Sequence, residues 1–413
     1  MAPRAAGVAA IEPFRPRRRR LPWVAAGVGA LAVGSAQAQS NLDFRYLYYQ
    51  ESGGRTKVLN PWIGLNQDFG LKGGTLSLLL AYDTITGASP TGGFPTIDAT
   101  TTASAAGSSS IPLVAYEDTR KSVTASYAHK FGAHLPSIDI SYSKENDYVA
   151  RGAGVTDAWT LAHGRGTLHF GASISRDVVT PVTTKISSDK SSNAVALGWS
   201  WIVSDRDLID VSGSLTNLSG YLTDPYKIVP VGLGTTPEIR PDSRSRKALL
   251  LKYGHYFVDA RGALKANFRY YWDDWAIRAY TLDLVHDQRV GSDWIVTPEL
   301  RLYSQDAASF FAYEFAAPQT FMSSDYRLSA FYSLLGGLTL SYRFPHEVTL
   351  SVGATYQRQY GRDRVAPRTA VAPPAFAALG EGGDGEGGEG GSSLVSPADL
   401  TTVTGTVGLT WRY

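Results

Sequence analysis

The final eight residues alternate between small or polar residues and apolar or aromatic ones. The apolar and aromatic members of this run are Val407, Leu409, Trp411 and Tyr413. Because successive side chains of a strand point to opposite faces, the run predicts a strand with one face suited to hydrocarbon and the other to water. An outer-membrane β-barrel closes on such a strand and places its terminal aromatic in the interfacial girdle. A soluble β-sandwich is the alternative.

The same alternation recurs from residue 39 onward and favours the barrel. It predicts about sixteen strands, near 42–49, 57–69, 76–83, 122–130, 138–144, 148–162, 166–176, 195–201, 208–218, 246–257, 263–272, 275–287, 294–304, 325–343, 348–360 and 404–413. An even number of strands is expected of a single-chain bacterial barrel. No apolar stretch approaches the roughly 20 residues that a membrane-spanning helix needs.

The connections between these strands fall into two classes. Long connections lie near 87–115, 177–190, 219–245, 305–324 and 361–398, and tight turns lie near 70–74, 131–136, 163–166, 204–207, 258–262, 289–293 and 344–347. If the strands run alternately up and down, all the long connections fall at one end. Long outer loops and short periplasmic turns are the outer-membrane arrangement, whereas Greek-key crossings would not separate the two classes.

The first 38 residues have the pattern of a secretory signal peptide. A basic region ends at Arg20, a short apolar run covers 21–33, and Ala36-Gln37-Ala38 offers small residues for cleavage. We therefore expect a signal peptide over 1–38 and a barrel over 39–413. The whole chain carries a net charge of +2 and residues 1–38 carry +5, which leaves −3 for the remainder. That charge gives no indication of nucleic-acid binding.

Six short motifs resemble a known family. They are DTITGASP at 83–90, EDTR at 117–120, ENDY at 145–148, GYLTDPYK at 220–227, RPDSR at 240–244 and YYWDDW at 270–275. In this order they resemble a bacterial family catalogued only as a domain of unknown function, DUF family 3570. The resemblance implies an outer-membrane barrel and brings no established activity, so no catalytic residues follow from it. The acidic glycine-rich run at 380–391 looks like an insertion outside the family pattern.

Charged residues of these motifs lie at the predicted loop end and form a candidate mouth cluster. Its members are Asp83, Asp118, Arg120, Glu145, Asp147, Asp224, Arg240, Asp242, Arg244, Asp273 and Asp274. A charged vestibule or a carboxylate-rich cation site is the functional interpretation. Alternatively, these residues have a structural role only, as solvated charges at the rim and as Asp side chains that stabilise the turns of the loops.

A second set of polar residues falls on the predicted inner face of the strands. The candidate lumen-lining residues are Lys252, Lys265, Asn267, Arg269, Asp283, Glu299, Arg301 and Arg343. A barrel of about sixteen strands is wide enough for an aqueous lumen. The mixed charges are compatible with a water-filled passage and equally with pairs that close it.

These patterns predict an outer-membrane barrel that acts as a passive channel for small polar or ionic solutes. The alternative is a non-conducting barrel that binds a partner, ligand or cation at its outer mouth. Enzymatic activity is not expected, because no spacing among Ser, His and acidic residues selects a catalytic set and the chain has no cysteine. No cofactor or metal is implied. The expected partners are membrane lipid, small polar solutes and, through the strand ending in Tyr413, the barrel-assembly machinery.

Overall fold

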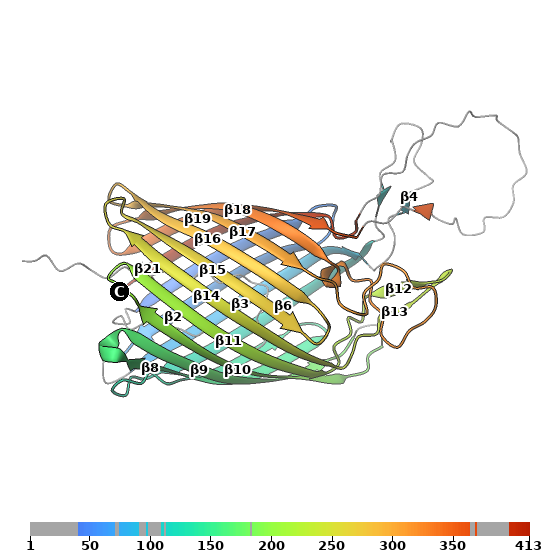
Figure 1. The fold of residues 1–413 in the computed structure, drawn as a ribbon, viewed down its shortest axis with the longest axis horizontal. Helices are drawn as coiled ribbons and strands as arrows, with labels where there is room; N and C mark the ends of the chain where they lie inside the picture. Colours follow the sequence, from blue (N-terminus) through green and yellow to red (C-terminus); the bar gives the residue numbers. More distant parts are fainter. Residues whose placement is uncertain are drawn as a thin grey trace, which may run out of the picture.

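The chain forms a closed barrel of sixteen antiparallel strands in the part that the structure describes (Figure 1). The structure, a computed structural model, describes residues 40–70, 74–90, 96–97, 109–110, 113–181, 184–363, 368–369 and 396–413. The predicted signal peptide lies outside these residues. The barrel strands are β1 (Asn41–Glu51), β2 (Lys57–Asp68), β3 (Thr75–Pro90), β6 (Leu113–Ala128), β7 (Ser137–Lys144), β8 (Tyr148–Leu161), β9 (Gly166–Val179), β10 (Ser188–Ile202), β11 (Asp207–Gly220), β14 (Ser243–Phe257), β15 (Gly262–Asp273), β16 (Arg278–Val290), β17 (Trp294–Gln305), β18 (Phe331–Arg343), β19 (Val348–Gly361) and β21 (Leu400–Arg412). The predicted fold class is confirmed.

The first and last strands pair and close the barrel. The pairing of β1 with β21 runs from Asn41 opposite Arg412 to Glu51 opposite Thr402. The backbone N–H of Tyr413 extends this pairing by donating to the carbonyl oxygen of Ser40 at 3.0 Å. Closure matters because backbone groups in hydrocarbon must find their hydrogen-bond partners within the protein.

The outer face of the barrel is apolar, as the alternation predicts. On β18, Tyr332, Leu334, Leu338 and Leu340 are 42–48% exposed, whereas the intervening Ser333, Thr339 and Ser341 face inward and are buried. Aromatic rings stack near both ends of the strands. The ring centroids of Trp294 and Tyr342 lie 4.8 Å apart at the tight-turn end. Those of Tyr332 and Tyr360 lie 5.0 Å apart at the loop end. Such rings suit the membrane–water boundary, where an apolar body and a polar tip are both solvated.

The two ends of the barrel differ in the length of their connections. The C-terminus lies at the end of the tight turns, and the hairpin of β12 (Ile228–Val231) and β13 (Gly234–Pro237) lies at the opposite, long-loop end (Figure 1). Among the described residues, no helix is long and apolar enough to cross a membrane.

Several strand limits differ from the prediction. β3 continues to Pro90 and β6 begins at Leu113, so strand pairing reaches into the predicted loop 87–115. Ladder hydrogen bonds involve only the backbone, so polar sequence can extend a strand beyond the membrane. The predicted loop 177–190 is shorter, because β9 ends at Val179 and β10 begins at Ser188. The acidic run at 380–391 lies outside the described residues.

Two predicted strands begin too early. β16 starts at Arg278 rather than 275, and β18 starts at Phe331 rather than 325. Residues 326–328 form the short 3-10 helix η2 (Tyr326–Leu328), which Asp325 caps by accepting a hydrogen bond from the backbone N–H of Arg327. A side-chain cap of this kind competes with extended structure, and alternation alone does not detect it. Two short strands, β4 (Thr96–Ile97) and β20 (Arg368–Thr369), also pair outside the barrel.

A charge placed on the lipid-facing side of one strand should destabilise the barrel. Val352 is 51% exposed on the outer face of β19, whereas Gln357 of the same strand faces inward. We expect Val352→Arg to lower the free energy of unfolding by about 2–4 kcal/mol and Gln357→Arg to have a much smaller effect. Urea unfolding in liposomes measures both. Equal effects of the two substitutions would contradict the assignment of the faces.

Candidate functional site

The outer mouth carries a folded cap. We define the outer cap as residues 221–242, 274–277 and 306–330, which connect β11 to β14, β15 to β16 and β17 to β18. Trp275, Ile277, Phe310 and Leu328 form one apolar cluster of the cap, and Val229, Phe315 and Met322 form another. Isolated backbone bridges join Val231 to Phe315 and Ile239 to Met322.

The cap folds toward the inside of the barrel. Tyr271 of β15 and Tyr303 of β17 face inward, because their neighbours Phe268 and Leu302 are exposed on the outer face. Tyr271 packs against the cluster that contains Phe310 and Leu328, and Tyr303 packs against Tyr326 and Phe331. The cap therefore rests on inward-facing side chains and narrows the mouth.

A group of buried charges holds the cap together. Asp325 is 2% exposed and accepts hydrogen bonds from Arg240 at 2.9 Å and from Arg327 at 3.0 Å. Arg240 also pairs with buried Glu238 at 2.6 Å. Arg327 reaches Asp224 at 2.9 Å. These pairs join the β12–β13 region to residues 325–327, which are far apart in the sequence.

The ionisation of the group follows from burial and charge. Burial acts to raise the pKa of Asp325, but Arg327, Lys227 and Arg240 overcome it and hold that pKa well below its usual range. Burial lowers the pKa of Lys227, with Asp325 partly offsetting the effect. Burial also raises the pKa of Glu238 against the influence of Arg240. Asp325 is thus the central anion on which two cations of the cap depend.

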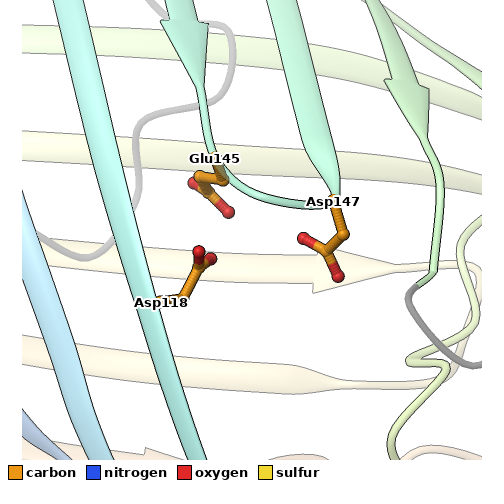
Figure 2. Close-up of side chains that lie close together, drawn as sticks. All are labelled: Asp118, Glu145 and Asp147. Carbon is orange, nitrogen blue, oxygen red and sulfur yellow. The ribbon is translucent and has the colours of Figure 1, made fainter.

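A second group, of three carboxylates, lies at the mouth on β6 and the β7–β8 turn, and one of them contacts the outer cap. Asp118 of β6 and Glu145 and Asp147 of the β7–β8 turn point toward one another (Figure 2), and one oxygen of each lies within 4.8 Å of the others. Asp118 accepts from the side-chain amide of Asn146 at 2.8 Å, and Asp147 accepts from the hydroxyl of Tyr226. Oxygen donors in this arrangement are of the type that hard cations prefer.

Burial and neighbouring negative charge change the pKa of Glu145. Burial raises the pKa of Glu145 to about 7, and the negative charge of Asp118 and Asp147 adds to the effect while Arg120 opposes it. The cluster therefore loses or gains a charge near neutral pH.

The remaining predicted mouth residues form pairs or stand apart. Arg120 forms an ion pair with Asp83, whose side chain is buried. Arg244 pairs with Asp273 at 2.5 Å and lies over the ring of Trp275 at 4.1 Å. Asp274 accepts from the backbone N–H of Ser245 at 3.0 Å, which is turn chemistry. Asp242 is exposed at the end of the outer cap, directly before β14. The eleven predicted residues thus divide into separate groups rather than one cluster.

The predicted lumen residues lie on the inner face of β14–β18. Lys265 pairs with Asp287 at 2.6 Å, and Arg301 pairs with Asp283. Lys252 lies 3.5 Å from Asp210 and its side chain is 46% exposed, although it faces inward. The remaining predicted lumen residues also face inward, because the residues on either side of each face the lipid: Asn267, Arg269, Glu299 and Arg343. Most of the charge on this wall is paired.

The wall next to these charges, on β19 and β21, is largely uncharged. The inward positions of β19 and β21 include Thr349, Ser351, Gln359, Thr402 and Thr410, all of which are buried. The inner surface therefore has a charged sector over β14–β17 and a hydroxyl-rich sector over β18–β21.

Sequence reasoning missed several residues of the cap and the wall. Lys227, Glu238, Asp325, Arg327 and Asp287 were not predicted as site residues. Asp325 stood at the start of a predicted strand, although an Asp directly before Tyr326-Arg327-Leu328 is a helix-capping pattern that could have been recognised. No local pattern distinguishes Lys227 or Glu238, because their burial depends on loops distant in the sequence.

Ser200, His169 and Asp210 meet on the inner wall in a hydrogen-bond cluster. Ser200 Oγ and Asp210 Oδ2 lie 2.9 Å and 3.1 Å from the same ring nitrogen, Nε2 of His169. Ser200 donates to Asp210 at 2.5 Å. A catalytic triad needs the serine and the acid on different nitrogens of the imidazole. These three residues are therefore arranged to satisfy one another rather than to activate the serine.

The geometry defines an outer-membrane-type β-barrel with a capped mouth and a polar inner wall. The family model described as "Protein of unknown function (DUF3570)" matches residues 24–367. The chain belongs to this family, which confirms the resemblance found in its motifs. No curated protein matches the chain.

Among the solved structures, the chain is similar to a secretin, to CdiB and to a siderophore receptor. A bacterial polysaccharide outer membrane secretin is 8% identical with a TM-score of 0.46, over 92% of this chain and 100% of the other. CdiB from Acinetobacter baumannii is 10% identical with a TM-score of 0.47, and the match covers 91% of this chain and 60% of CdiB. The siderophore receptor PirA from Pseudomonas aeruginosa is 10% identical with a TM-score of 0.40, and the match covers 80% of this chain and 57% of the receptor. This chain therefore spans little more than half of that receptor. At these identities the similarity concerns architecture alone.

Removing the charge of Asp325 should loosen the cap. Asp325→Asn keeps the shape but leaves Arg240 and Lys227 without their central anion, and breaking a buried pair typically costs about 3–5 kcal/mol. We expect chymotrypsin to cleave within 306–330 much faster in this variant. Asp306→Asn removes a carboxylate from an exposed pair with Arg362, 3.2 Å apart, and serves as the control. Equal cleavage rates in the two variants would refute a central role for Asp325.

Stability should depend on pH through Glu145. Its pKa is raised from 4.5 to about 7, so the folded state holds this proton more tightly and stability falls as pH rises through that interval. We expect Glu145→Gln to raise the unfolding temperature relative to the native protein at pH 8, with little difference near pH 4.5. Asp205→Asn, which removes an exposed carboxylate from a tight turn, is the matched control. A native protein and E145Q that show parallel pH profiles would disprove the proposed charge crowding.

Proposed function

We propose that the protein is a passive channel of the bacterial outer membrane for small polar or ionic solutes. The observation that carries this proposal is the exposure of Lys252. Its side chain faces the lumen from β14 and is 46% exposed, which supports access of water to the charged sector of the wall. A lysine facing a dry interior would instead be expected to be buried and fully paired.

The composition of the wall supports polar rather than apolar cargo. The charged sector carries both signs, in Lys265–Asp287 and Arg301–Asp283, and the adjoining sector offers hydroxyl groups. Sixteen strands give a circumference compatible with a water-filled passage. The outer cap would then restrict the size of the solutes that enter.

A non-conducting barrel that binds a ligand at its mouth is the second candidate, and the buried contacts of the cap favour it. Tyr271 and Tyr303 of the inner wall are in direct contact with cap residues. A cap that closed the mouth completely would leave the lumen open only at the end of the tight turns.

Site-directed thiol labelling distinguishes the two candidates, since the chain contains no cysteine of its own. Asn267 lies on the inner wall between Lys252 and Asp283. We expect the native protein to give conductance steps in planar bilayers. We expect a cationic methanethiosulfonate reagent to reduce the conductance of Asn267→Cys, because it adds bulk and charge to the passage.

Leu251→Cys provides the matched control, because Leu251 is the neighbour of Lys252 on the lipid-facing side. Its labelling should leave the conductance unchanged. Absence of conductance steps from purified native protein would overturn the channel proposal and favour the binding barrel.

A further inference from the structure

Four basic side chains form a row on the lipid-facing surface near the loop end. They are Lys121 of β6, Lys144 of β7, Arg151 of β8 and Arg176 of β9, on four adjacent strands. All four are exposed, and each shares its face with lipid-exposed neighbours such as Tyr127, Ile140, Val155 and Ile174. We call these four residues the basic row.

The members of the basic row lie opposite one another. Lys121 is directly paired with Lys144, and Arg151 is directly paired with Arg176. Tyr142, the outward neighbour of Lys144, is paired with Arg151 and links the two pairs. Directly opposed side chains of a sheet lie about 5 Å apart, and like charges at that distance are destabilising. Two such pairs in succession need a negative charge from outside the strands.

The protein supplies little of that charge. Among the residues that the structure describes, no carboxylate forms an ion pair with any member of the row. Within the described part of the chain, Arg176 donates to the carbonyl oxygen of Ser175 at 2.9 Å and to the side-chain oxygen of Asn193 at 3.4 Å. The nearby Asp189 lines the same shallow hollow, of about 410 Å³, as Arg151, Arg176 and Val178. Asp177 also lines this hollow, but it is buried, faces inward and pairs with Lys190 at 3.9 Å. The four exposed bases therefore leave this part of the outer surface with a net positive charge.

The height of the row on the barrel indicates what neutralises it. On β7 the outward side chains run from Ile138 and Ile140 through Tyr142 to Lys144, toward the loop end. On β9 they run from Phe170 through Ile174 to Arg176. On these two strands apolar side chains lead up to a base, and on β9 the outward Val178 follows it. Long basic side chains in this position extend their charge to the membrane–water boundary.

We propose that the basic row binds the phosphorylated headgroup of an outer-leaflet glycolipid such as lipid A. A lipid fits better than a soluble anion, because the apolar side chains directly below the row would contact the acyl chains. Arginine binds phosphate oxygens through two parallel hydrogen bonds, and lysine adds point charge. Adjacent strands lie about 4.8 Å apart, so four strands span roughly 14 Å, which is wide enough for more than one phosphate.

This inference rests on the outer-membrane location in the proposed function but not on conduction. The test measures how much bisphosphorylated lipid A the purified full-length barrel retains from mixed micelles, by native mass spectrometry. We expect the variant Lys121→Gln, Lys144→Gln, Arg151→Gln, Arg176→Gln to retain at least about tenfold less, since it loses several charge-assisted hydrogen bonds. Planar-bilayer conductance of the same variant should be unchanged, so a failure of lipid binding and a failure of channel function are distinguishable.

Lys247→Gln is the matched control. Lys247 also faces outward near the loop end, on β14, but its direct neighbours are Leu215 and Trp272 rather than another base. Its loss should leave lipid A retention unchanged. Heat-modifiable migration on gels verifies that all variants fold.

Two further arms identify the bound group. Monophosphorylated lipid A should be retained less than the bisphosphorylated form. Inorganic phosphate at millimolar concentration should not displace lipid A. Equal retention of lipid A by the native protein and the fourfold variant would overturn the proposal, and so would full displacement by inorganic phosphate.

Discussion

The structure depends on the closure of the backbone hydrogen-bond network between the first and last strands. Within a bilayer, an open sheet would leave a row of unpaired N–H and C=O groups in hydrocarbon. The pairing of β1 with β21, over Asn41–Glu51 and Thr402–Arg412, removes that edge. The closed cylinder has two different surfaces, an apolar outer one and a polar inner one.

The two surfaces divide the chemistry of the protein. The inner surface combines paired charges on β14–β17 with hydroxyl groups on β18–β21, and its exposed lysine supports a role in the passage of polar solutes. The outer surface is apolar over most of its height and becomes basic at one sector of the loop end. Only one face of each strand contributes to each function, so substitutions one residue apart should act on different properties.

The cap adds a third environment, in which charges are buried by loops. Asp325 unites Arg240 and Arg327 from segments that are far apart in the sequence, and apolar side chains such as Val229 and Met322 exclude water around them. Burial of such a group is costly unless every charge is paired, so the pairs specify one arrangement of the loops. The arrangement of the cap loops therefore depends on these charge pairs together with the apolar clusters.

The sequence alone determined the barrel, its strand count of about sixteen and its two classes of connection, because alternation with period two is local and can be recognised in a single chain. Its short motifs indicated the family. It also placed Lys252, Lys265 and Arg301 on the inner face by the same rule. Tertiary structure decided how the mouth residues group, since Asp118 meets Glu145, and Asp224 meets Arg327, only once strands and loops are in place. Likewise, the opposition of Arg151 to Arg176 depends on strand register, which pairing between distant segments sets.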